Sequence, residues 1–214
     1  KLTLSHTTYF KLKNDSTLNT LIIGTLAGLV IATIIAHIIN QRMRTKLRVG
    51  RITGLEIETK NILDRVVYRT LADRALVLKF HNGKIMMVGG DKFISVLFES
   101  HTAKVQGVKK DFQNYKVDTA YLKTINGLMT DGLIITKVDE LPQGLLRRQY
   151  ERENITATVI FRIATTGNTL YFGSMSSTTE IDGFVGSTDY SLLEIEINKL
   201  RNLYSKAKSF KILH

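Results

Sequence analysis

Residues 21–39 read LIIGTLAGLVIATIIAHII, an apolar run without a charged side chain. A helix rises about 1.5 Å per residue and the hydrocarbon core of a bilayer is roughly 30 Å thick, so about 20 apolar residues are needed to cross it. Together with Thr20 and Asn40, the run has that length. The sequence therefore predicts one transmembrane helix over residues 20–40, preceded by a polar tail over residues 1–19.

Two other interpretations of this run remain open. A secretory signal has a shorter apolar core, of about 7 to 15 residues, with a small-residue cleavage site close behind it. A buried helix of a soluble domain needs protein on every side, and the polar flanks here offer no obvious partner. We favour the membrane anchor. The first residue is Lys1 rather than Met, from which we expect trimming, maturation or an incomplete N-terminus.

Small residues recur every four positions inside the run, at Gly24, Gly28, Ala32 and Ala36. This spacing places them along one narrow face of the helix. Because lipid is as apolar as leucine, helices associate in a membrane through close backbone packing, which small residues permit. Glycine and alanine are also common in membrane helices that do not associate. We expect these four residues to form a helix-packing face and the chain to be a homo-oligomer.

A basic juxtamembrane segment follows over residues 41–58, where a connecting helix also begins. Its cations are Arg42, Arg44, Lys46, Arg48 and Arg51. Positively charged flanks stay in the cytoplasm, so we expect the large C-terminal domain to be cytoplasmic and the N-terminal tail to lie outside. The cluster also suits anionic lipid headgroups, at about 1 kcal/mol for each charge near the surface.

The net charge of the chain is +11, but most of it sits beside the predicted membrane span. Residues 1–51 carry +7 and residues 52–214 only +4. We therefore do not expect nucleic acid as the partner, because topology already accounts for the basic cluster. The chain has no cysteine, which excludes disulfides, thiolate metal sites and cysteine nucleophiles.

Hydrophobic periodicity predicts helices and strands alternating after the span. Helices are expected over residues 52–71, 121–129, 145–153 and 190–204, with a hinge or break near Gly50 and Gly54. Strands are expected over residues 74–80, 84–88, 92–99, 132–138, 157–164 and 169–175, and a loop over residues 100–116. Turn residues His81-Asn82-Gly83 and Gly167-Asn168 predict that the first two strands and the last two strands form hairpins.

An antiparallel or mixed sheet with helices gathered on one face is the economical packing for this order, so the predicted class is α+β. The pattern resembles the GAF-like domains, with the similarity spread over residues 60–207 and the domain set at residues 59–208 before a short tail, 209–214. The matching stretches are LADRALVLKFHNG at residues 71–83, ENITATVI at 153–160 and YFGSM at 171–175. The resemblance implies leading and closing helices packed together behind the sheet, and a pocket between the sheet and the central loops.

The overall plan is also similar to the T-type holins of T-even phages. That resemblance implies a globular domain in the periplasm, whereas the basic cluster after Asn40 predicts the opposite. A phage or bacterial origin would suit either resemblance.

Catalytic chemistry is not evident in the sequence. No nucleophile can be paired with a base, and no spacing of His or carboxylates suits a metal, so we expect a non-enzymatic protein without a cofactor. Four residues are candidates for contact with an unknown ligand or protein partner: His81, Asn82, Arg147 and Arg148. The alternatives are a turn histidine bonded to nearby backbone and a solvated helix face.

Three functions follow as hypotheses. The first is a single-pass membrane protein whose domain binds a ligand or partner and thereby shifts the packing of self-associated membrane helices. The second is a holin-like pore former in phage lysis. The third is a structural component of a phage particle or membrane complex.

Overall fold

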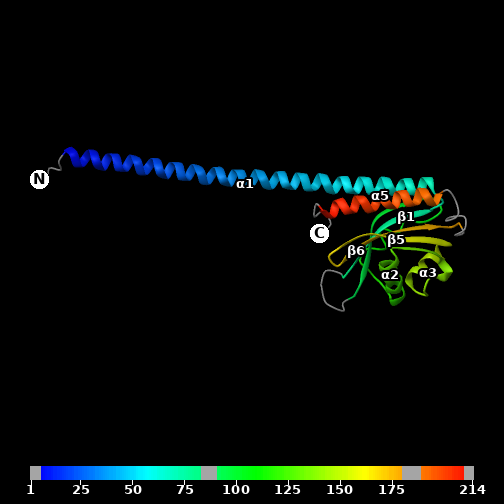
Figure 1. Cartoon of the computed structure of the whole chain (residues 1–214). Coiled ribbons are helices and arrows are strands. Elements are labelled where there is room, and N and C mark those ends of the chain that lie inside the picture. The colour runs from blue at the N-terminus through cyan, green and yellow to red at the C-terminus, as the bar shows by residue number, and fades with distance from the viewer. Residues whose placement is uncertain (1–5, 83–90, 180–188, 210–214) are drawn as a thin grey trace. The chain divides into compact units, whose positions relative to one another are not determined.

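The computed structural model describes the backbone of residues 6–82, 91–179 and 189–209, and side chains from Ile23 onward within those ranges to Ala207, except residues 189–190. The chain divides into two compact units, Lys1–Gly50 and Arg51–His214. Helix α1 (His6–Arg69) begins in the first unit and ends in the second (Figure 1). Its stretch Ile23–Arg69 is long and apolar enough to cross a membrane, and its most apolar window is not buried.

Helix α1 is continuous through Gly50 and Gly54, so the break expected there is absent. It also begins at His6, inside the stretch expected as a polar tail. A glycine in a helix interior costs only about 1 kcal/mol relative to alanine, which the helix formers around each glycine offset. The boundary between the two compact units nevertheless falls at Gly50.

The second unit is built on a six-stranded sheet in the order β3-β2-β1-β6-β5-β4. All neighbouring strands are antiparallel. The strands are β1 (Arg74–His81), β2 (Phe93–His101), β3 (Tyr115–Lys116), β4 (Leu133–Lys137), β5 (Ala157–Thr166) and β6 (Thr169–Ser177). The helices after α1 are α2 (Thr119–Asp131), η1 (Val138–Glu140), α3 (Leu145–Arg152) and α5 (Asp189–Ser209). The α+β class is confirmed.

The β5–β6 hairpin forms as predicted, with Gly167 at a φ of 54° in its turn. For the first predicted hairpin, the structure describes only one of the two strands, β1. Strand β1 pairs with β2 on one edge and with β6 on the other from Arg74 to Phe80. The expected partner, residues 84–88, lies outside the described residues. A turn signal favours a hairpin locally but does not choose between two strand candidates that follow it.

Successive side chains of β1 face opposite sides of the sheet, as a strand requires. Ala75 and Val77 enter one buried cluster, and Leu76 and Leu78 enter another. Both faces of the sheet are therefore covered, which explains why the RALVLKF stretch is nearly continuously apolar instead of alternating.

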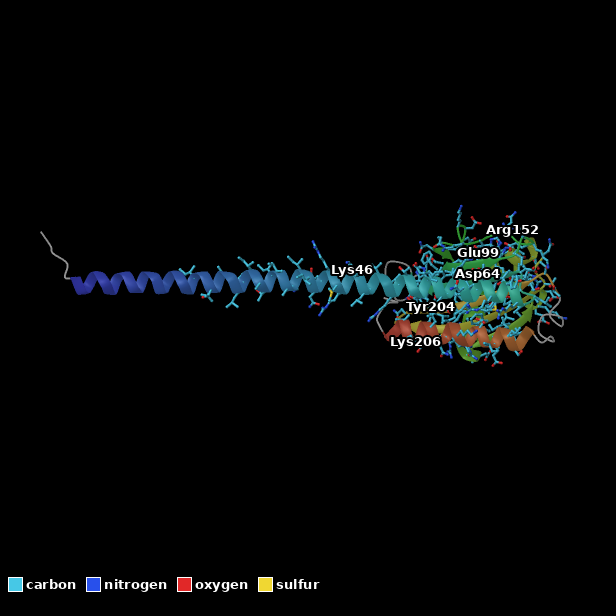
Figure 2. The ribbon with its side chains drawn as sticks, turned by 90° about the horizontal axis from the view of Figure 1, so that it is seen from above. Lys46, Asp64, Glu99, Arg152, Tyr204 and Lys206 are labelled. Atoms are coloured by element: carbon cyan, nitrogen blue, oxygen red, sulfur yellow. The ribbon has the colours of Figure 1, made fainter. Side chains whose placement is uncertain are left out.

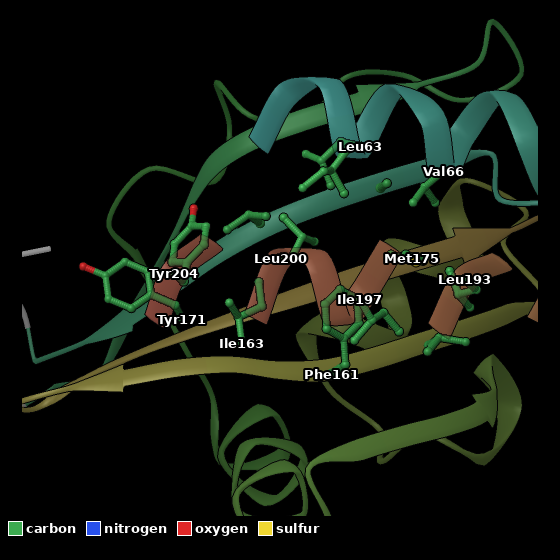
Figure 3. Packing of buried hydrophobic residues seen from close by; sticks show 14 of the residues in the cluster. Leu63, Val66, Phe161, Ile163, Tyr171, Met175, Leu193, Ile197, Leu200 and Tyr204 are labelled. Atoms are coloured by element: carbon green, nitrogen blue, oxygen red, sulfur yellow. The ribbon is translucent and has the colours of Figure 1, made fainter. Parts of the chain in front are cut away.

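The first face is covered by the end of α1 and by α5, as predicted for the leading and closing helices (Figure 1). Figure 3 shows Leu63 and Val66 of α1 and Leu200 of α5 pointing into one core above the sheet residue Phe161. Arg65 and Glu196 join the two helices at the rim of this core, with Nη2 and Oε2 3.2 Å apart.

The opposite face is covered by α2, α3 and the 102–114 loop. Asp118 accepts from the Tyr121 N–H at 2.8 Å and from the Leu145 N–H at 2.7 Å, so one carboxylate fixes the starts of α2 and α3. Helix α2 is capped at its C-terminal end by Gly132, which has a φ of 76°. The sheet is thus sandwiched between two helical layers, and the second layer forms the wall of the candidate site.

Candidate functional site

A buried arginine marks the second face of the sheet. Arg74 is the first residue of β1 and is only 1% exposed. Its Nη2 donates to the Gln106 carbonyl at 2.6 Å and to the Glu153 carboxylate. Its Nε lies 3.7 Å from Glu99 Oε1 and has no hydrogen-bond partner. Buried charges are tolerated when they are paired, and here two carboxylates surround one guanidinium.

Glu99, on β2, holds the 102–114 loop against the sheet. Its Oε1 accepts from the Val108 N–H at 2.7 Å and its Oε2 from the Lys109 N–H at 2.9 Å. Together with the Arg74 contact to Gln106, these bonds fix the loop at three backbone positions. We call Arg74, Glu99 and Glu153 the ionic latch. It joins the sheet, the loop and the end of α3.

An apolar cavity of about 30 Å³ lies inside the latch, between the sheet and α2, α3 and the loop. Its walls are mainly aliphatic and aromatic, with polar groups from Arg74, Gln149, Tyr150 and Ser174. A water needs roughly 10–15 Å³ by this measure. The cavity therefore has room for no more than a few waters in this conformation.

A polar hollow of about 490 Å³ lies outside the latch. It is lined by the 104–108 stretch of the loop, by Asp111 and by the residues that end α3, including Arg152 and Glu153. Val108 and Gln149 line both the hollow and the inner cavity. Glu99 of the latch and Arg152 of the hollow are labelled in Figure 2. The ion pair between Arg74 and Glu153 thus lies between the polar hollow and the apolar cavity.

Hydroxyl groups complete the floor of the cavity. The Tyr150 hydroxyl and Ser174 Oγ are 2.8 Å apart, and the Thr158 hydroxyl donates to Tyr150 Oη at 3.3 Å. Burial raises the pKa of Tyr150, and these two bonds offset only part of the shift. The phenol is therefore neutral at physiological pH and acts as a hydrogen-bonding group.

Asp73 ties together the segments around the start of β1. Its Oδ2 accepts from the Thr178 N–H at 2.8 Å and hydroxyl at 2.7 Å, and Lys104 Nζ lies 3.3 Å from its Oδ1. Burial alone would raise the pKa of Asp73, but these donors and the Lys104 charge hold it below its ordinary value.

We expect Asp73→Asn to lower the free energy of unfolding by about 1.5–3 kcal/mol at pH 7, because it removes hydrogen bonds to a buried carboxylate. Since the folded pKa lies below the unfolded one, this stabilisation is complete above the ordinary Asp pKa and is lost as the pH falls through the folded value. Urea unfolding from pH 7 to pH 3 checks this. A difference between the variant and the parent that grows on acidification would contradict it.

The predicted contact residues His81 and Asn82 lie at the far end of β1 from Arg74. The His81 ring stacks on Phe93, with centroids 6.1 Å apart, and its Nε2 is 3.3 Å from Ser95 Oγ. Burial and the charge of Lys79 lower the pKa of His81. Asn82 Oδ1 accepts from Lys92 Nζ at 2.7 Å. These contacts are typical of a structural strand end.

Arg147 and Arg148 lie on α3, at the other end of β1 from His81, so the structure does not bring the two predicted pairs together. Arg147 pairs with Glu151 at 2.6 Å and donates to the carbonyls of residues 139 and 141. Arg148 is exposed. The ligand role predicted for these four residues stays a prediction.

The membrane-helix residues all lie exposed on α1. Apart from the nearby backbone of α1 itself, no atom lies within 4 Å of a Cβ built at Gly24 or Gly28, and Ala32 and Ala36 are exposed as well. The five basic residues from Arg42 to Arg51 are exposed, and Figure 2 shows side chains around Lys46 standing out on both sides of the helix. Packing between helices and contact with headgroups stay predictions.

The latch residues were missed from the sequence. Arg74 opens the RALVLKF stretch, where a charged residue before an apolar strand resembles an ordinary strand boundary. Glu99 and Glu153 follow 25 and 79 positions later, and no spacing rule connects them. Within the described residues, no group of His, Asp and Glu is arranged to hold a metal ion.

Comparison with known proteins identifies the fold. No protein-family model matches the chain. No curated protein matches it either. Solved structures do. The GAF domain region of a protein from Geobacter sulfurreducens PCA, provisionally described as a membrane protein, aligns with a TM-score of 0.50 at 15% identity, over 73% of this chain and 97% of that one.

Two further GAF domains align similarly. The GAF3 photoproduct state from Synechocystis sp. PCC6803 has a TM-score of 0.50 at 15% identity, over 75% of this chain and 99% of that one. A phycoerythrobilin-bound GAF domain from a cyanobacterial phytochrome has a TM-score of 0.50 at 11% identity, over 78% and 95%. The second unit therefore has the fold of a GAF domain, as the sequence resemblance implied. The resemblance to holins finds no support in these comparisons.

Proposed function

We propose that this chain is a non-catalytic, single-pass membrane protein whose GAF-fold domain holds a small ligand or partner and reports its presence through α1. The observation that carries the proposal is the latched cavity. An apolar interior lies directly behind a polar vestibule, and the ion pair between them also fixes the covering loop. Occupancy of the cavity would therefore change how the loop is held.

The cavity argues against a large ligand. Sites for drug-sized ligands measure roughly 300–1,000 Å³, about ten times the volume found here or more. We therefore do not propose that this cavity binds a ligand like the phycoerythrobilin of the phytochrome domain. A small ligand enters only when the 102–114 loop moves outward, which requires the latch to loosen.

The charges beside the apolar stretch support a proposal for the orientation of the protein. Five basic residues come directly after the apolar stretch of α1, from Arg42 to Arg51. We propose that they hold the domain on the cytoplasmic side and contact anionic headgroups. This location would give the domain access to intracellular ligands.

Self-association in the membrane is the output that we propose, since α1 presents Gly24 and Gly28 uncovered. We expect the double variant Gly24→Ile, Gly28→Ile to lower dimer crosslinking severalfold, because branched side chains keep the backbones apart. Thr33→Ile, half a turn around the helix from Gly24, is the matched control. The chain has no cysteine, so Met43→Cys, on the exposed face of α1, gives one defined disulfide crosslink in native membranes. Equal crosslinking in all variants would reject self-association through this face.

The link between domain and span has a separate readout. We expect Glu99→Gln, which weakens the hold on the loop at Val108 and Lys109, to change the Met43→Cys crosslinking yield. Glu151→Gln, on the exposed side of α3, is the control. If the yield is the same for both, the domain does not signal through α1.

The holin-like pore former and the phage structural component stay as alternatives without an observation that favours them. A pore former would collapse the membrane potential on expression and release an endolysin. A structural component would purify with a large assembly.

A further inference from the structure

The ligand chemistry can be named from the latch, on the assumption that the proposed sensor function is correct. We propose that the cavity takes a small apolar monocarboxylate, whose carboxylate replaces Glu153 on Arg74 and whose hydrocarbon body occupies the space behind it. The proposal depends on four features of the described residues: the cavity wall, the guanidinium, the position of Glu153 and the attachment of the loop.

The cavity wall selects an apolar body. Its sheet side is made by side chains that are each at most 6% exposed, namely Leu76, Leu78, Ile94, Val96 and Phe172. Unpaired polar groups of a ligand would cost free energy against such a surface. A short alkyl or aryl group is the body that matches it.

The guanidinium selects an anion. Arg74 lines the cavity, is 1% exposed, and keeps its Nε without a hydrogen-bond partner. A guanidinium presents its N–H groups as a planar fork that matches a carboxylate in two parallel bonds. In the present conformation Nη2 is engaged with Glu153 while the neighbouring Nε donor is unused. A ligand carboxylate that reaches both nitrogens would satisfy the unused donor.

The exchange of one carboxylate for another preserves the buried charge. Glu153 is 12% exposed and borders the polar hollow, which Lys104 and Arg152 also line. When Glu153 leaves Arg74, it moves toward water and these two cations. The cluster keeps one guanidinium and two carboxylates. A neutral amide would leave Arg74 with one carboxylate fewer, and an amine would add a positive charge beside it, so both are disfavoured.

Replacement of Glu153 by a ligand carboxylate on Arg74 also affects the 102–114 loop. Nη2 of Arg74 also donates to the carbonyl of Gln106, and the adjacent residues 108 and 109 are held by Glu99. A ligand larger than the present 30 Å³ displaces Val108 and Phe112 from the wall of the cavity. Binding of the ligand carboxylate and the position of the loop are thereby coupled through the side chain of Arg74.

The test uses the full chain in lipid nanodiscs and three six-carbon probes, hexanoate, hexanamide and hexylamine, titrated by calorimetry against empty nanodiscs as the blank. We expect hexanoate to bind about tenfold or more tighter than the other two, since a hydrogen bond between charged groups is at stake. Glu153→Gln removes the competing carboxylate, so it should bind hexanoate about tenfold tighter than the parent. Glu151→Gln, two residues away and exposed, should match the parent.

Each other outcome overturns the inference in a recognisable way. If hexanamide or hexylamine binds as well as hexanoate, the cavity accepts ligands but does not select carboxylates, and the sensor function stands. If Glu153→Gln leaves hexanoate binding unchanged while its thermal unfolding shows a folded domain, Arg74 is not the group that binds the carboxylate. If no probe binds, the ligand class is wrong, and the sensor function is judged separately by the crosslinking yield of Glu99→Gln.

Discussion

Gly173→Ala is expected to destabilise the domain by about 3 kcal/mol or more, the upper part of the range for an overpacked core. Gly173, on β6, is paired with Phe161 on β5. A Cβ at Gly173 would lie 2.0 Å from the Phe161 ring, far inside van der Waals contact. The ring is fully buried in the core under α5, so it cannot move aside into solvent.

Gly127→Ala is the matched control for this substitution. Gly127 lies inside α2, where a Cβ meets only Ile134 Cδ1 at 3.7 Å. We expect a gain of about 0.5–1 kcal/mol, because alanine is the better helix former. Urea unfolding of the full chain in mild detergent, followed by near-ultraviolet circular dichroism, measures both. If Gly173→Ala is as stable as the parent, the packing of β5 against β6 described here is wrong.

Arg74→Met should cost about 3–5 kcal/mol, because it leaves two buried carboxylates facing each other without their cation. Their side chains are only 8% and 12% exposed, for Glu99 and Glu153 respectively. Adding Glu153→Gln to Arg74→Met should restore part of the loss, since one of the two unpaired charges disappears. This recovery distinguishes an electrostatic latch from simple loss of packing volume.

The same unfolding measurement provides the double-mutant cycle. Arg148→Met, at an exposed position on α3, controls for the arginine substitution and should stay within about 0.5 kcal/mol of the parent. If Glu153→Gln changes the free energy of unfolding equally in the parent and in Arg74→Met, Arg74 and Glu153 are not coupled.

Local patterns were enough to place most elements. Apolar alternation and a Gly-Asn turn give β5 and β6 together, and helical periodicity gives α2 and α5 within a few residues. These elements depend on contacts between residues close in sequence. The order of the strands was not predicted, because the pairing of β1 with β6 joins residues about 100 positions apart.

The candidate site could not be predicted from local sequence patterns. His81 and Asn82 were selected because a histidine at a turn is chemically versatile, yet they lie at the opposite end of β1 from the latch. Arg74, Glu99 and Glu153 have ordinary neighbours in sequence and acquire their role only when the sheet and α3 enclose them. These three charged side chains interact because the fold buries them together, and that burial cannot be seen in the local sequence.

The central claim is that α1 anchors a GAF-fold domain to a membrane with the domain inside the cell. Protease treatment of sealed cells, compared with permeabilised ones and followed by fractionation without detergent, tests it most directly. We predict that the domain is protected until the membrane is opened and that the intact chain sediments with the membranes. Recovery of the intact chain in the soluble fraction, or digestion of the domain in sealed cells, would contradict this account.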